Sequence, residues 1–170
     1  MIFSFDARAL KIAAALCAAL AVSACSKNPN EDGAAGAGGL GMGAGAATPG
    51  SQQDFVVNVG DRVFFESDSS ELTSVAQATL DKQARWLSQY PRYTITVEGH
   101  ADERGTREYN FALGARRAEA AKNYLTARGV PASRIRTISF GKERPVAVCN
   151  DISCWSQNRR AVTVLGGPSS

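Results

Sequence analysis

Apolar residues recur at helical spacing in the stretch that follows residue 71. The positions are three or four residues apart, as expected for a helix that buries one face: Leu72, Ala76, Leu80, Ala84 and Leu87. Thr73 is a suitable N-cap, and Pro91 lies just beyond the last apolar position. These signals predict a helix of about four turns.

A second helix is predicted from about Thr106 to Arg128, because Gly129 and Pro131 follow it and end helices. At 100° per residue, its apolar stripe contains Tyr109, Leu113, Ala120, Ala121 and Tyr124. Arg117 falls inside this stripe, Asn110 lies on the same side, and Arg116 lies at the edge. A buried arginine needs a partner, since an unpaired buried charge costs several kcal/mol.

Strand-like segments alternate with these helices. Tyr93, Ile95 and Val97 alternate with polar residues, which is typical of a half-buried strand. Shorter strands are predicted at 62–65, 136–140 and 161–165, the last one preceded by a turn of helix at 155–160. The order strand-helix-strand-helix-strand-strand predicts an α/β (α+β) sandwich, with two main helices on one face of a small mixed sheet.

The N-terminus has the pattern of an export signal. Arg8 and Lys11 precede an apolar run, 12–22, that is too short to cross about 30 Å of hydrocarbon as a helix. The run ends in Val-Ser-Ala-Cys, which resembles the lipobox of bacterial lipoproteins. We therefore expect a signal peptide at 1–24 and lipid on Cys25, and Ser26 favours sorting to the outer membrane. The alternative is an ordinary secretory peptide cut nearby, which leaves Cys25 an idle thiol.

A tether is expected between the lipid and the folded domain. Of the 18 residues from 33 to 50, 14 are Gly or Ala, too few large side chains to build a core. We assign 25–53 to the lipidated N-terminus and tether, and 54–170 to one compact domain.

The four cysteines have different expected fates in an exported protein. Cys17 leaves with the signal peptide and Cys25 takes lipid, so Cys149 and Cys154 remain in an oxidising compartment and are expected to form a disulfide. The alternative, half of a metal site, lacks a second ligand pair because His100 is the sole histidine. No metal or other cofactor is expected.

The charge pattern excludes a nucleic-acid partner. The net charge is only +3, and Lys and Arg form no run. Within 54–170 there are 13 Arg and 3 Lys, a bias toward the planar group that pairs with carboxylates.

The segment 98–110 places a loop rich in both charges directly before a helix N-terminus, where backbone amides favour an anion. This combination predicts a site for a zwitterion. Asp102 is the nearest carboxylate for the buried Arg117, so two readings stay open. One is a structural ion pair, and the other is a pair that a ligand divides or shares.

The stretch 97–118, which begins Val-Glu-Gly-His-Ala-Asp-Glu-Arg-Gly-Thr, resembles the OmpA-like peptidoglycan-binding domain, in particular its lipoprotein branch, the peptidoglycan-associated lipoproteins. Weaker similarity extends the resemblance over 54–165. It implies a ligand, the meso-diaminopimelate of the peptidoglycan stem peptide, whose side chain ends in an ammonium and a carboxylate. The residues that it implies for this ligand are Asp102 for the ammonium, Arg117 for the carboxylate, Arg104 as a further contact, Leu113 against the aliphatic stem, and Asp68.

Ser67 stands where the family has an aromatic residue before the Asp68 position, which puts stacking there in doubt. The resemblance also implies exchange of partners with TolB and other Tol proteins during cell division, and no enzymatic activity. Two other classes compete with this reading. A wall hydrolase would use Glu98 and Asp102 as its carboxylate pair, and a flagellar stator subunit would need an uncleaved membrane helix. His100 is expected to be structural, and Trp86 and Trp155 to be core or partner contacts.

Overall fold

The computed structural model describes residues 47–168. The predicted signal peptide, Cys25 and the tether up to residue 46 lie outside the described residues. Within the described range, no helix is both long and apolar enough to cross a membrane.

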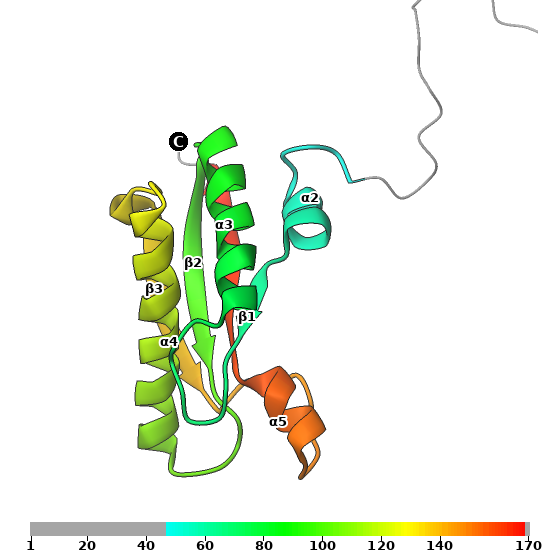
Figure 1. The fold of residues 1–170 in the computed structure, drawn as a ribbon, viewed down its shortest axis with the longest axis vertical. Helices are drawn as coiled ribbons and strands as arrows, with labels where there is room; N and C mark the ends of the chain where they lie inside the picture. The colour runs from blue at the N-terminus through cyan, green and yellow to red at the C-terminus, as the bar shows by residue number, and fades with distance from the viewer. Residues whose placement is uncertain (1–46, 169–170) are drawn as a thin grey trace, which may run out of the picture. The chain divides into compact units, whose positions relative to one another are not determined.

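A mixed sheet of four strands forms one layer (Figure 1). Its strands, in the spatial order β1-β4-β2-β3, are β1 (Arg62–Phe64), β4 (Arg160–Pro168), β2 (Tyr93–His100) and β3 (Ile135–Gly141). β2 pairs in parallel with β3 and antiparallel with β4, which in turn pairs antiparallel with β1. The predicted mixed sheet is confirmed.

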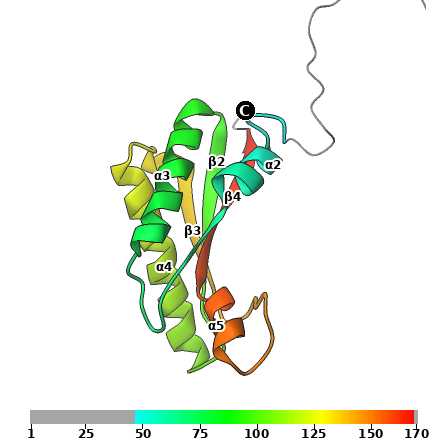
Figure 2. The same ribbon diagram turned by 45° about the vertical axis from the view of Figure 1, so that its right-hand side comes forward.

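Helices α3 (Ser74–Gln89) and α4 (Arg107–Ala127) contact each other and cover one face of this sheet (Figure 2). Both begin where the sequence predicts. The hydroxyl of Thr73 accepts from the amide of Ala76, and that of Thr106 accepts from Tyr109, each at 3.2 Å. The predicted arrangement of two main helices on a sheet is confirmed.

The core lies between the helices and the sheet. Its fully buried members include Leu80, Leu87, Ile95, Val97 and Leu125. Leu80 and Leu87 belong to the predicted stripe of α3, and Ile95 and Val97 are the inward residues of β2, as their periodicity predicted. Leu125 lies on the buried face of α4 but outside the stripe predicted for that helix.

The part of the chain that the structure describes begins with residues that the sequence predicts to belong to the tether. A short helix, α2 (Gln52–Asp54), runs into a π-turn, η1 (Phe55–Val59). Asp54 accepts hydrogen bonds from the Trp86 indole at 2.8 Å and from the amide of Gly50 at 2.9 Å. The hydroxyl of Tyr93 donates to the carbonyl of Gly50 at 2.8 Å. The segment therefore packs on the domain from residue 50 onward.

Two short helices complete the fold: η2 (Ala132–Arg134) before β3, and α5 (Ile152–Asn158) before β4. The helix predicted at 155–160 thus begins earlier, at Ile152. Asp151 explains the difference, because its side chain caps the helix by accepting from the amide of Ser153 at 2.7 Å.

Candidate ligand-binding site

The loop that joins β2 to α4 lies beside the loop that joins β1 to α3, and together they border a hollow of about 260 Å3. Its lining contains both charges and one apolar side chain: Ser67, Asp68, Asp102, Arg104, Gly105, Tyr109, Asn110 and Leu113. Four of the five ligand residues predicted from the sequence meet here. A larger hollow of about 520 Å3 lies beside Phe111, but none of the five predicted ligand residues lines it, so we place the zwitterion chemistry in the smaller one.

Asp102 is 7% exposed and has two arginine partners. Arg104 donates to it through Nη2 at 2.7 Å and through Nε at 3.1 Å, and Nη1 of Arg159 lies 3.5 Å from its Oδ2. Burial opposes ionisation, but the hydrogen bonds from Arg104 and Arg159 outweigh it and hold the pKa of Asp102 below its ordinary value. Asp102 is therefore a carboxylate at neutral pH.

Arg117 is completely buried, as the helical wheel predicted, but the predicted direct ion pair with Asp102 is wrong. Its guanidinium donates instead to three backbone carbonyls: His100 at 2.8 Å, Ser69 at 2.8 Å and Glu66 at 3.1 Å. Backbone carbonyls can accept from the N–H groups of a buried guanidinium, and the sequence does not reveal which carbonyls lie within reach. Burial lowers the pKa of Arg117 to about 10, so it stays charged.

Arg117 thus joins the end of β2 to the β1–α3 loop from behind the hollow, and it is not among the residues that line it. Arg116, by contrast, is exposed, and its guanidinium lies 5.9 Å from the ring of Tyr109.

Asp68 and Tyr109 close one side of the hollow. The Tyr109 hydroxyl donates a hydrogen bond to the carboxylate of Asp68, and Arg104 donates to the hydroxyl of Ser67 at 2.9 Å. Asp68 has a φ of 56°, a left-handed conformation that aspartate tolerates better than most residues. The two loops therefore meet through side-chain contacts at the rim.

Tyr109 is 44% exposed, although the wheel placed it in the buried stripe. The buried face of α4 is turned instead toward Gly114 and Ala118. Gly114 allows this, because a Cβ atom there would lie 2.4 Å from the Ser139 hydroxyl and 2.9 Å from the carbonyl oxygen of Gly99. The helix comes closest to the sheet at this glycine, and Tyr109 is left at the rim.

The floor of the hollow is formed by buried α4 residues. Leu113 is 4% exposed, and Asn110 is 2% exposed and donates to the carbonyl of Arg104 at 2.7 Å. Leu113 supplies an apolar surface next to charged groups, and Asn110 fixes the loop above it.

His100 lies in a buried stack and not in the hollow. It is 2% exposed, its ring lies 5.6 Å from that of Phe140, and the guanidinium of Arg144 covers the Phe140 ring at 3.5 Å. Burial lowers the pKa of His100 to about 4, assisted by the charges of Arg160 and Arg144. It is neutral at pH 7, in agreement with a structural role.

Two contributors to the site were not predicted from the sequence. Arg159 is the second partner of Asp102, and Trp155 places its ring 4.2 Å from the Arg104 guanidinium while donating to Glu103 at 2.5 Å. Both come from α5 and the residue after it, more than 50 positions along the chain. Both residues lie within the range 54–165 over which the sequence resembles the family, but nothing in that resemblance indicated which charge Arg159 meets.

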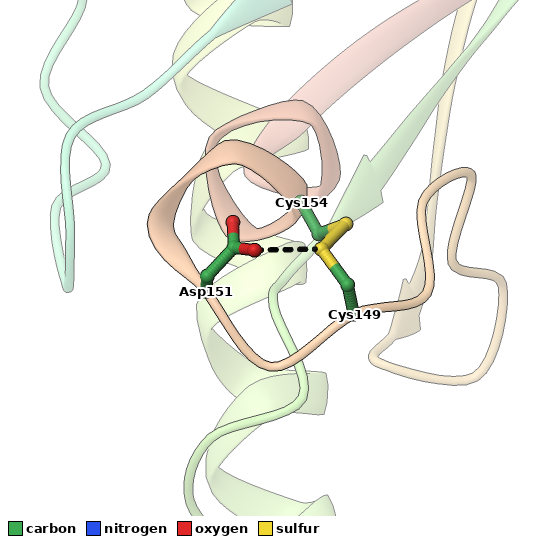
Figure 3. Close-up of side chains that lie close together, drawn as sticks. All are labelled: Cys149, Asp151 and Cys154. Carbon is green, nitrogen blue, oxygen red and sulfur yellow. Dashed lines mark hydrogen bonds between the residues drawn. A yellow bond between two sulfur atoms is a disulfide. The ribbon is translucent and has the colours of Figure 1, made fainter.

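A disulfide joins Cys149 to Cys154, with their Cα atoms 5.7 Å apart (Figure 3). Oδ2 of Asp151 lies 3.4 Å from the Cys149 sulfur (Figure 3). These three residues also have the spacing of a metal site. Because thiolates and not disulfide sulfurs bind metal ions, the bonded pair does not fit a metal.

Comparison with known proteins identifies the family. The sequence profile of the OmpA family matches residues 64–159. The chain is 69% identical to the peptidoglycan-associated lipoprotein of Rhizobium meliloti (strain 1021) over 159 residues, which cover 94% of this chain and 88% of the relative. It is 50% identical over 97 residues to the protein of that name from Pseudomonas aeruginosa, which cover 57% of each chain.

Solved structures agree. The crystal structure of the peptidoglycan-associated lipoprotein from Burkholderia pseudomallei matches with a TM-score of 0.61 and 42% identity, covering 62% of this chain and 90% of that one. The C-terminal domain of Helicobacter pylori MotB has the same fold, with a TM-score of 0.60 at 22% identity over 64% of this chain and 86% of that one. The chain therefore belongs to the OmpA family and, within it, to the peptidoglycan-associated lipoproteins.

Proposed function

We propose that this protein binds peptidoglycan without covalent attachment, through the meso-diaminopimelate of a stem peptide, and tethers the outer membrane to the cell wall. The observation that carries the proposal is the hollow in which Asp102 and Asp68 lie beside Arg104. The names of the relatives, which associate them with peptidoglycan, support the same conclusion.

The chemistry of the hollow suits a small zwitterion on an aliphatic stem. Its volume of about 260 Å3 is sufficient for the end of one amino-acid side chain. Asp102, held ionised, is the proposed acceptor for the ammonium, with Asp68 nearby. Arg104 and the amides at the start of α4 are the proposed donors to the carboxylate, because a helix N-terminus favours an anion. Leu113 packs against the methylene groups.

Arg117 remains part of the proposed site, with a changed role. Its three hydrogen bonds hold His100, Glu66 and Ser69 around the hollow, so it shapes the pocket. Direct contact with the ligand carboxylate requires it to release a carbonyl of the β1–α3 loop.

The remaining parts of the proposal concern the chain before residue 47 and the partners. Cys25 carries the lipid after removal of residues 1–24, and the glycine-rich tether lets the domain reach the wall from the periplasmic face of the outer membrane. TolB and other Tol proteins are the proposed protein partners during envelope constriction. If the protein does not co-purify with TolB from solubilised envelopes, the proposed partnership with TolB is contradicted.

The proposed role is non-enzymatic, and two features of the site support this. The arginines beside Asp102 keep it ionised, so it cannot act as a proton donor at neutral pH. Glu98, the second carboxylate of the hydrolase reading, lies on the sheet, and its Oε2 is 3.8 Å from Nε2 of His100. A pair of carboxylates with separate acid and base roles needs one raised pKa.

The test is co-sedimentation of the chain from residue 26 to 170 with purified sacculi. We expect binding that free diaminopimelate stem peptide displaces, and no soluble wall fragments. Asp102→Asn, which keeps the shape and removes the charge, is expected to lower affinity on the order of 100-fold. Glu119→Gln is the matched control, because it also replaces a carboxylate by an amide but lies on the side of α4 away from the hollow. It should bind normally. Release of soluble fragments, or equal binding by Asp102→Asn, would contradict the proposal.

A further inference from the structure

We infer that Trp155 is a positioning residue: held in place by the Cys149–Cys154 disulfide, it fixes the guanidinium of Arg104 at the mouth of the pocket. The inference rests on the proposed ligand role of the Asp102–Arg104 loop. It assigns a function to α5 and its disulfide, which the proposed binding chemistry leaves unexplained.

The first step concerns how α5 is held. A helix of seven residues is not stable by itself in water. The disulfide ties Cys154, within the helix, to Cys149 in the preceding loop. At the other end Asn158, completely buried, donates to the carbonyl of Ala147 at 2.8 Å and accepts from the amide of Val146 at 2.8 Å. The loop is thus fastened to both ends of α5.

The second step concerns what α5 presents. Trp155 and Arg159 are four residues apart and face the same side. Trp155 donates to Glu103 and stacks on Arg104, while Arg159 contacts Asp102. One turn of chain therefore contacts three consecutive residues, 102–104, of the loop that joins β2 to α4. Cys154, which the disulfide holds, directly precedes the tryptophan.

The third step concerns why Arg104 needs this support. Its side chain is 44% exposed, and a free arginine side chain loses about 2 kcal/mol of rotamer entropy when it is ordered. The Trp155 face and the Asp102 carboxylate order it before any ligand arrives. A donor that is already ordered binds its acceptor at a smaller entropic cost. Trp86, the other tryptophan, is 5% exposed in the core and has no such contact.

The first experiment measures the order of Arg104 directly, without ligand. In the chain from residue 26 to 170, which contains all the described residues, 47–168, 15N relaxation of the Arg104 Nε–H group should report a rigid side chain. Trp155→Leu and the double variant Cys149→Ser with Cys154→Ser should both make it mobile on the nanosecond scale. Trp155→Phe, which keeps a ring and loses the bond to Glu103, should be intermediate. Val148→Ala, in the same loop and 88% exposed, is the control and should match the wild type.

The second experiment measures affinity for a diaminopimelate stem peptide by calorimetry. Trp155→Leu should weaken binding about 3- to 10-fold. In an Arg104→Ala background the same change should have no further effect, because a positioning residue acts only through the residue it positions.

The outcomes separate the two proposals. If Arg104 stays rigid in a folded Trp155→Leu protein, the positioning role is overturned. It is also overturned if Trp155→Leu lowers the affinity of the Arg104→Ala protein as much as it lowers that of the wild type. If the wild type binds no stem peptide while Arg104 still loosens in Trp155→Leu, the proposed ligand is wrong and the positioning role stands.

Discussion

The guanidinium of Arg117 donates a hydrogen bond of 2.8 Å to the carbonyl oxygen of His100, two residues before Asp102. Its other bonds reach Glu66 and Ser69, so one buried cation joins two loops that are far apart in sequence. Removing it takes one donor from each of the three carbonyls, of which that of Glu66 keeps the amide of Ser69 at 3.3 Å. We expect Arg117→Ala to lower the free energy of unfolding by about 3 kcal/mol or more, measured by urea denaturation.

Arg116→Ala is the matched control for that change, since it removes the same side chain from the exposed side of the same helix. It should alter stability by less than about 0.5 kcal/mol. Stem-peptide binding should survive in Arg116→Ala and disappear in Arg117→Ala. An Arg117→Ala protein that is as stable as the wild type would contradict the structural role described above.

His100 makes stability depend on pH. Its pKa is about 4 in the folded protein and about 6.5 when unfolded, so between these values the unfolded chain binds more protons. The contribution of neutral His100 is complete above pH 6.5 and is lost as the pH falls toward 4. From pH 6.5 to pH 5 the free energy of unfolding should fall by about 1.5 to 2 kcal/mol. His100→Leu should flatten this slope, and because the chain has no other histidine, an unchanged slope would refute the assignment.

Two substitutions at Asp68 separate the effect of its side chain from the effect of its backbone conformation on stability. Both Asp68→Ala and Asp68→Gly remove the carboxylate that accepts from Tyr109, but the φ of 56° strains only the alanine. The glycine variant should be more stable than the alanine variant by about 1 kcal/mol in thermal unfolding. Both should weaken stem-peptide binding equally if the carboxylate contacts the ligand. Equal stability of the two variants would indicate that the loop relaxes.

Gly114 tests the close contact between α4 and the sheet. In a helix, alanine is favoured over glycine by about 1 kcal/mol, so Gly114→Ala would stabilise an uncrowded helix. Here the new Cβ lies 2.4 Å from the Ser139 hydroxyl and meets the Gly99 backbone. Overpacking costs about 1–3 kcal/mol, and we expect a net loss of about 1–2 kcal/mol by calorimetry. Gly167→Ala, with no atom within 4 Å, is the control.

The sequence predicted the elements well because their signals are local. Thr73 caps the helix that it was expected to cap, and Thr106, near which the second helix was predicted to begin, caps that helix. The alternation around Ile95 reports a strand with one buried face. The boundary of the domain was harder to place. Gly50 and Ser51 belong to a stretch whose composition is typical of a tether, yet a single carboxylate, Asp54, together with the buried ring of Phe55, holds this segment against Trp86.

Four of the five residues predicted to bind the ligand lie together in the structure, but several of their contacts differ from the prediction. Asp102, Arg104, Asp68 and Leu113 meet around one hollow, and Arg117 is buried. The partner of Arg117 was wrong because backbone carbonyls leave no trace in a sequence. Arg159 and Trp155 were missed because the contact depends on how α5 is placed, and no periodicity reports that. Tyr109 was misplaced because one glycine, Gly114, turns the buried face of the helix.

In the proposed tethering role, the hydrogen bond between Tyr93 and Gly50 sets the direction in which force would cross the domain. The chain enters the fold at the first residue of β2, whereas the pocket lies just beyond the last, roughly 25 Å away at about 3.3 Å per residue. Figure 1 accordingly places α2 and α5 toward opposite ends of the sheet. A pull between membrane and wall would run lengthwise along β2, which is hydrogen-bonded to β4 on one side and to β3 on the other. Such a pull would load those bonds together in shear and would not open them one at a time.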